Sequence, residues 1–165
     1  SDVYKRPAGC SRLHALLQAA TEPPEKNVDR DVIENKLESL RRCLVRVAEK
    51  CPDSAEKLAT DPDAQDILTL NLTRSIQLCV DIAVHLIAST DSPPPTTMGA
   101  SFDALAATGV IDNELAVKLK KAVGFRNIAI HNYEAVDWQI VFAIATQHLD
   151  DFTDFARHTI ETLKL

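Results

Sequence analysis

The sequence predicts an all-α protein, a single domain built as an antiparallel bundle of four long helices and one short helix. A chain of 165 residues is long enough for one hydrophobic core and too short for two ordinary domains. Its composition is typical of helical proteins, with 45% hydrophobic and 25% charged residues but only 4 glycines. Apolar residues recur at spacings of three and four, and no segment alternates in the manner of a strand.

The first 26 residues differ from the rest of the chain. A short amphipathic helix is predicted near Leu13 and Leu17, followed by a linker that contains two prolines. We therefore treat residues 1–26 as an N-terminal appendage, either natural or introduced in cloning, and residues 27–165 as the domain.

The first long helix is predicted where the regular apolar pattern begins at Asp29, and it ends at Pro52. Its apolar stripe is Ile33, Leu37, Leu40, Leu44 and Val47.

A second, longer helix is expected to start near Asp61 and to stop before the three consecutive prolines 93–95. Its stripe is Leu68, Leu72, Ile76, Cys79, Ala83 and Leu86. The short helix follows, with Ser101 as its predicted N-cap and Gly109 as its terminator.

Two more long helices complete the bundle. Asp112 is placed to cap a helix that carries Leu115 and Leu119 and closes near His131. Asp137 is placed to cap a final helix that runs without interruption to the end of the chain. Its stripe is Trp138, Val141, Ala145, Leu149, Phe152, Phe155, Thr159 and Leu163.

Charge and cysteine content limit the classes of function. With 18 basic and 24 acidic residues the net charge is -6, so any contact with nucleic acid must rest on a local cluster of cations. Lysines 118, 120 and 121, together with Arg126, provide such a cluster. The four cysteines form no C-x-x-C pair and are typical of reduced thiols. No apolar run approaches the roughly 20 residues that span a bilayer, which predicts a cytoplasmic protein without a membrane contact.

Arg126 is the first residue that breaks the helical pattern, because it occupies the apolar stripe of Leu115 and Leu119. Alone, it is interpreted as an arginine that reaches the surface or pairs with a buried carboxylate. His131 lies on another face, with Asn127 one turn before it. The Asn127 amide is placed to orient the imidazole, and a histidine that only caps the helix is the alternative.

The second long helix carries a polar seam of Arg74, Asp81 and His85. Asp81 is placed to pair with His85 one turn away or with Arg126 on a facing helix. The D-x-x-x-H spacing lacks a convincing third ligand, so we predict neither a metal site nor a cofactor.

The string 125–133 contains the pattern R-N-x-x-x-H-x-Y, formed by Arg126, Asn127, His131 and Tyr133. This string resembles the HepT-like members of the HEPN superfamily of helical ribonucleases. The segments 81–85, 102–105 and 109–111 add to the resemblance, which covers residues 28–165.

The resemblance implies a HEPN-type bundle that forms a homodimer, in which two R-x4-H motifs meet in a cleft. It implies the toxin of a toxin–antitoxin system, an endoribonuclease that cleaves RNA without a metal, and no action on DNA is expected. His131 is then the general acid or base, Arg126 binds phosphate oxygens, and Asn127 orients either His131 or a phosphate. Asp81 and His85 are assigned as supporting residues.

The resemblance also implies a regulatory site at Tyr133. HepT-like toxins are nucleotidylated on this tyrosine by a minimal nucleotidyltransferase antitoxin of the MntA type. AMP on Tyr133 would add bulk and negative charge beside the phosphate site and so repel RNA.

Two alternatives remain open at this point. The first is a non-catalytic helical partner that presents substrate to a nucleotidyltransferase. The second is a structural dimer in which an Arg126–Asp81 pair specifies the interface and His131 only caps its helix.

Overall fold

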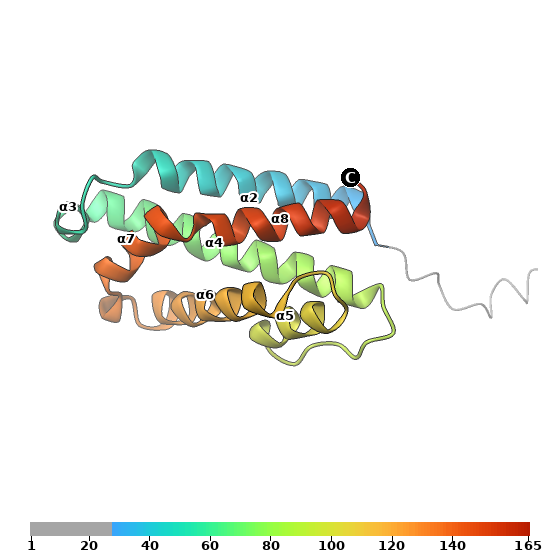
Figure 1. Ribbon diagram of the computed structural model, residues 1–165. Helices are drawn as coiled ribbons and strands as arrows, with labels where there is room; N and C mark the ends of the chain where they lie inside the picture. The colour runs from blue at the N-terminus through green and yellow to red at the C-terminus, as the bar shows by residue number, and fades with distance from the viewer. Residues whose placement is uncertain (1–27) are drawn as a thin grey trace, which may run out of the picture.

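The computed structural model describes residues 28–165, and within them every regular element is helical (Figure 1). The elements are α2 (Arg30–Lys50), α3 (Ala55–Ala59), α4 (Pro62–Ala88), α5 (Met98–Ala107), α6 (Asn113–His131), the 3-10 turn η1 (Tyr133–Ala135), α7 (Trp138–Gln147) and α8 (Leu149–Leu163). The four longest helices, α2, α4, α6 and α8, run alternately in opposite directions, which confirms the predicted all-α antiparallel bundle. The predicted appendage, residues 1–26, lies outside the described residues.

Aspartate side chains set where several helices begin. Asp29, Asp61, Asp112 and Asp137 each accept a hydrogen bond from a backbone N–H in the first turn that follows. A carboxylate there satisfies an otherwise unpaired donor and faces the positive end of the helix dipole. The Arg30 guanidinium at the start of α2 donates to the carbonyl of Leu163 at the end of α8, so these two helix ends are joined.

The last predicted helix is in fact two helices. The chain leaves helical geometry at His148 (φ -123°, ψ 8°), which separates α7 from α8. The apolar stripe is continuous in sequence, but its two halves are buried against different neighbours. α7 packs against α3 at one end of the bundle, whereas α8 lies along α4 and α6 (Figure 1).

Two smaller differences concern short elements. α3 was not predicted, because five residues are too few for a periodic pattern, although its Leu58 is fully buried. α5 begins at Met98 with Thr97 as N-cap, and the predicted cap Ser101 is a buried residue that donates to the Met98 carbonyl at 2.5 Å. Gly109 ends this helix with a positive φ of 80°, as predicted.

α4 is the central helix, flanked by α2 and α6 (Figure 1). It buries twelve residues, and beside it the rings of Phe102 and Phe155 pack edge to face with centroids 5.9 Å apart. The expectation that no segment is long and apolar enough to cross a bilayer is corrected here. In the described residues α4 alone meets that criterion, with a mean hydropathy of 1.3 over its most apolar 18-residue window, half of which is buried in the bundle.

Candidate functional site

The R-x4-H string occupies the last turns of α6. The helix ends at His131, where the N–H of Asn132 still donates to the carbonyl of Ile128 at 2.8 Å. Arg126 lies on the inward side of α6 with the buried residues Leu115 and Leu119, as the spacing predicts. Its position therefore carries a guanidinium to the boundary between core and surface.

The Arg126 guanidinium is incompletely satisfied. Its Nη1 donates to the Asn127 side-chain oxygen at 3.2 Å, while its Nε is buried without a hydrogen-bond partner. No carboxylate within residues 28–165 forms an ion pair with it. A cation held in this way leaves unused hydrogen-bonding capacity, and a bound anion would supply the missing acceptors. Arg126 therefore forms no structural ion pair within the described residues.

Asp81 does not have either of the partners that the sequence suggested. Its carboxylate accepts from Lys36 Nζ on α2 at 3.3 Å and from Gln77 Nε2 at 2.8 Å. Asp81 therefore joins α4 to α2 and pairs with neither His85 nor Arg126. His85 is exposed on α4, so within one chain neither residue joins the α6 motif.

His131 and Asn127 are both exposed on α6. The interpretation that Asn127 orients His131 is not supported by its contacts, because its side-chain oxygen accepts from Arg126. Asn127 instead fixes one edge of the guanidinium. His131 presents its ring to solvent at the end of the helix, accessible to a substrate or to a second subunit.

Tyr133 opens the η1 turn two residues beyond His131. Its side chain is 40% exposed, its ring packs edge to face on Trp138 at 5.9 Å, and its hydroxyl donates to Asp66 on α4 at 2.8 Å. Partial burial and the Asp66 carboxylate together raise the pKa of Tyr133 above its ordinary value of 10.0. The hydroxyl is thus protonated at neutral pH, positioned by one acceptor and open to solvent.

Asp66 is a site residue that the sequence analysis missed. It is 67 positions away from Tyr133 and belongs to the exposed face of α4. The antiparallel arrangement does predict that the start of α4 lies near the end of α6. It does not distinguish Asp66 from Asp61 or Asp63, because all three are exposed carboxylates at the start of that helix.

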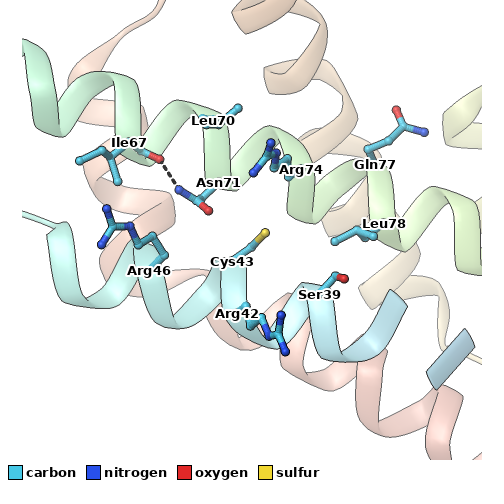
Figure 2. A pocket seen from close by; sticks show the side chains of 10 residues that line it. All are labelled: Ser39, Arg42, Cys43, Arg46, Ile67, Leu70, Asn71, Arg74, Gln77 and Leu78. Atoms are coloured by element: carbon cyan, nitrogen blue, oxygen red, sulfur yellow. Dashed lines mark hydrogen bonds between the residues drawn. The ribbon is translucent and has the colours of Figure 1, made fainter. Parts of the chain in front are cut away.

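A groove of about 680 Å³ lies between α2 and α4. Figure 2 shows Arg42 and Arg46 on α2 and Arg74 on α4 along its sides, with Cys43 between them. No carboxylate is among the residues that line it. This groove therefore places three arginines beside one cavity.

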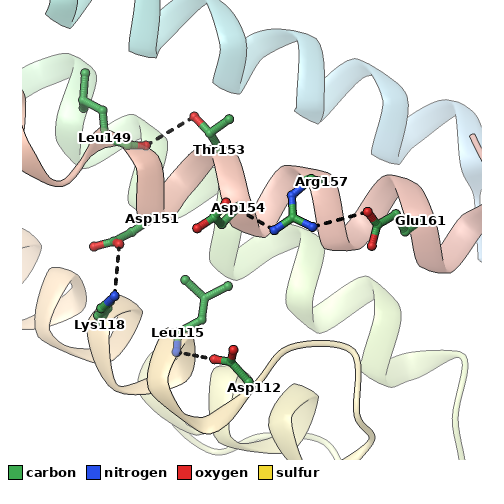
Figure 3. A network of polar contacts seen from close by, with 9 residues as sticks. All are labelled: Asp112, Leu115, Lys118, Leu149, Asp151, Thr153, Asp154, Arg157 and Glu161. Atoms are coloured by element: carbon green, nitrogen blue, oxygen red, sulfur yellow. Dashed lines mark hydrogen bonds and ion pairs between the residues drawn. The ribbon is translucent and has the colours of Figure 1, made fainter.

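The net positive charge around the motif is smaller than the sequence suggested, because two of the nearby lysines are paired with carboxylates. Lys118 pairs with Glu114 at 3.1 Å and approaches Asp151 at 3.9 Å, the second contact being drawn in Figure 3. Lys120 pairs with Asp103 at 2.9 Å. The local field around α6 is therefore partly neutralised by its own neighbours.

Residues 28–165 contain no group of three or more His, Cys, Asp or Glu side chains arranged to hold a metal ion. Cys43, Cys51 and Cys79 are free thiols, and burial raises the pKa of each of them. These cysteines are consequently poor nucleophiles at neutral pH.

Comparison with known proteins gives a consistent result. Residues 30–159 match the ribonuclease HepT-like family. The mRNA nuclease HepT of Shewanella oneidensis is 36% identical over 125 residues, which are 76% of this chain and 93% of that protein. The tri-AMPylated Shewanella oneidensis HEPN toxin, solved in complex with MNT antitoxin, has a TM-score of 0.75 and 34% identity over 81% of this chain and 98% of its own.

The same fold occurs in a more distant protein. YutE of Bacillus subtilis, described as a cytosolic protein of unknown function, has a TM-score of 0.72 at 18% identity, over 83% of this chain and 92% of its own. That likeness concerns the fold alone. The family match over residues 30–159 and the 36% identity to a curated nuclease are decisive: the chain belongs to the ribonuclease HepT-like family.

Proposed function

We propose that this chain is the toxin of a toxin–antitoxin system, with residues 27–165 as its domain, and that it acts as a metal-independent endoribonuclease. Arg126 and His131 are its catalytic residues. Among its relatives are an mRNA nuclease and a HEPN toxin bound to its antitoxin. RNA and a nucleotidyltransferase antitoxin of the MntA type are the partners, in the cytoplasm.

One observation carries the proposal: Arg126 is a half-buried guanidinium that lacks a carboxylate partner among the described residues and has an unsatisfied Nε. An RNA phosphate supplies the acceptors that are missing. Arginine suits this role because its planar fork matches two phosphate oxygens at once.

The chemistry needs no protein nucleophile. The 2′-hydroxyl of RNA attacks the adjacent phosphorus, a pentacoordinate phosphorane forms, and the 5′-oxygen of the next nucleotide leaves. His131 accepts the 2′-proton or donates a proton to the leaving oxygen, and Arg126 stabilises the charge of the phosphorane. Asn127 acts through Arg126 by holding the guanidinium in place.

A homodimer brings together the catalytic side chains that one chain holds apart. On one ideal helix, Arg126 and His131 lie about 140° apart around the axis and about 7.5 Å apart along it. A cleft between two copies brings two arginines and two imidazoles to one phosphate, so that one His131 acts as base and the other as acid.

Tyr133 is the proposed control point. Its exposed hydroxyl loses its proton to a base and attacks the α-phosphorus of ATP held by the antitoxin, and pyrophosphate leaves. The AMP that remains places negative charge two residues from His131. That charge competes with RNA for Arg126 and blocks the cleft.

The test is cleavage of RNA by the purified chain in EDTA, after intact mass has shown that Tyr133 is unmodified. We expect Arg126→Ala and His131→Ala each to reduce cleavage at least about 100-fold while circular dichroism shows an unchanged fold. Arg157→Ala, which removes an exposed arginine of α8, should retain full activity.

If the parent and both folded variants are equally inert on every RNA tried, catalysis is excluded. The non-catalytic partner of a nucleotidyltransferase would then be the function to pursue. If Arg126→Ala instead lowers the free energy of unfolding by several kcal/mol, the structural-dimer interpretation gains support.

A further inference from the structure

The groove between α2 and α4 has a charge opposite to that of the chain as a whole. The net charge is -6, yet the residues that line the groove include three arginines and no acidic side chain. The remaining lining is neutral: Ser39, Cys43, Ile67, Leu70, Asn71, Gln77 and Leu78. An anion in this groove would meet cations on both walls, as Figure 2 shows.

Two of the three arginines are not neutralised. Among residues 28–165, neither Arg46 nor Arg74 forms an ion pair, whereas Arg42 shares Glu38 with Arg41 at 3.1 Å. Arg74 lies close enough to the thiol of Cys43 on the opposite helix to oppose the rise of its pKa that burial causes. Arg74 and Cys43 thus line the groove from opposite helices (Figure 2).

The groove opens on the same face of α4 as the contact to Tyr133. Asp66, Leu70 and Arg74 follow one another at spacings of four, which places them on one side of the helix. Asp66 holds the Tyr133 hydroxyl, and Leu70 lines the groove one turn further along. From Asp66 to Arg74 the distance along the helix axis is about 12 Å, a little over two helical turns.

We propose that this groove binds the phosphate backbone of the single-stranded RNA on which the α6 motif acts. Arg46 and Arg74 contact successive phosphates, and Arg42 adds a weaker contact at the rim. The proposal rests on the proposed ribonuclease function and extends it, because it assigns a substrate-binding surface outside the R-x4-H string.

The composition of the groove also determines how RNA would be recognised. No aromatic side chain lines it, so bases have no surface on which to stack. Arginine forks bind phosphates without reading sequence. Binding in the groove should therefore be strongly dependent on salt and tolerant of base sequence.

The test uses the full chain and a single-stranded 2′-O-methyl RNA, which lacks the attacking hydroxyl and so measures binding without cleavage. The double variant Arg46→Gln with Arg74→Gln should weaken binding about tenfold or more. The slope of log affinity against log salt should fall by about 1.4, since each phosphate contact on a single strand contributes about 0.7. A control with Arg41→Gln and Arg157→Gln removes the same two charges outside the groove and should change neither quantity.

Cleavage gives an independent readout. For long RNA the double variant should raise KM much more than it lowers kcat, and the rise in KM should be smaller for a dinucleotide, which is too short to occupy the groove. Arg46→Lys with Arg74→Lys should recover most of the salt slope, because the charges are restored.

Unchanged affinity and salt slope in the glutamine variant would overturn the proposal. Loss of the native oligomeric state in that variant, measured by light scattering, would also overturn it, because the groove would then be a protein interface. The ribonuclease function is judged separately by Arg126→Ala and His131→Ala, and its failure leaves the binding measurement interpretable.

Discussion

At the residue scale, the site depends on the hydrogen bonds that its polar side chains form or lack. Arg126 has an unsatisfied Nε, Asn127 holds one edge of its guanidinium, and Tyr133 is fixed by Asp66. The unsatisfied Nε of Arg126 is consistent with an anionic ligand. The contact with Asp66 keeps the Tyr133 hydroxyl protonated, and the side chain stays accessible to solvent.

Asp66 provides a pH prediction. Burial and the Asp66 carboxylate raise the pKa of Tyr133 above 10.0, so the contact contributes stability below pH 10 and loses it as pH rises past the folded-state pKa. Asp66→Asn should lower the pKa of Tyr133 toward its ordinary value, because the negative charge that disfavours tyrosinate is removed.

The measurement is the ultraviolet titration of tyrosinate, with Tyr133→Phe subtracted because the chain has 2 tyrosines. A Tyr133 pKa that does not move in Asp66→Asn would show that the hydrogen bond is absent in solution.

Sequence and structure agree on these residues only in part. The spacing correctly predicted an arginine on the inward stripe of α6 and a tyrosine just beyond the helix. It did not predict the Tyr133–Asp66 contact or the Asp81–Lys36 pair, because both join residues that are far apart in sequence. Spacing along one helix defines a face, and the partner on that face depends on how the helices pack.

At the element scale, caps and terminators determine where the helices stop. The caps Asp112 and Asp137 and the terminator Gly109 were predicted from the sequence, because their chemistry is local. The helix starts at Asp29 and Asp61 were also predicted, and both residues are caps in the structure. The break at His148 was not predicted, since nothing in the stripe changes there. It arises from the packing of α7 across the end of the bundle.

Two glycines allow a matched test of how a helix terminator and a helix interior affect stability. Gly109 has a φ of 80° and Gly124 lies inside α6 with no atom within 4 Å of an added Cβ. Gly109→Ala should destabilise the protein by about 1 kcal/mol, because alanine resists the left-handed region. Gly124→Ala should stabilise it by about 0.5 to 1 kcal/mol through helix propensity. Urea unfolding of both variants checks the two signs, and a neutral Gly109→Ala would contradict the assigned turn.

At the scale of the whole molecule, the bundle brings together segments that are far apart in sequence. The end of α6 lies beside the start of α4 because these helices run in opposite directions (Figure 1), and Tyr133 contacts Asp66 there. The α2–α4 groove begins at the next residue of α4, Ile67. The helical class and the order of the long elements were predictable from periodicity. The positive groove was not, because Arg42, Arg46 and Arg74 are distributed over two helices and form no cluster in sequence.

The most direct test of the central claim is the identity of the ends produced when the unmodified chain acts in EDTA on an oligonucleotide with one ribose in a deoxyribose background. Attack by a 2′-hydroxyl predicts a single cut, after that ribose, that leaves a 2′,3′-cyclic phosphate and a 5′-hydroxyl. The all-deoxyribose strand should stay intact. Cleavage at deoxyribose positions, or products with a 5′-phosphate and a free 3′-hydroxyl, would contradict the account.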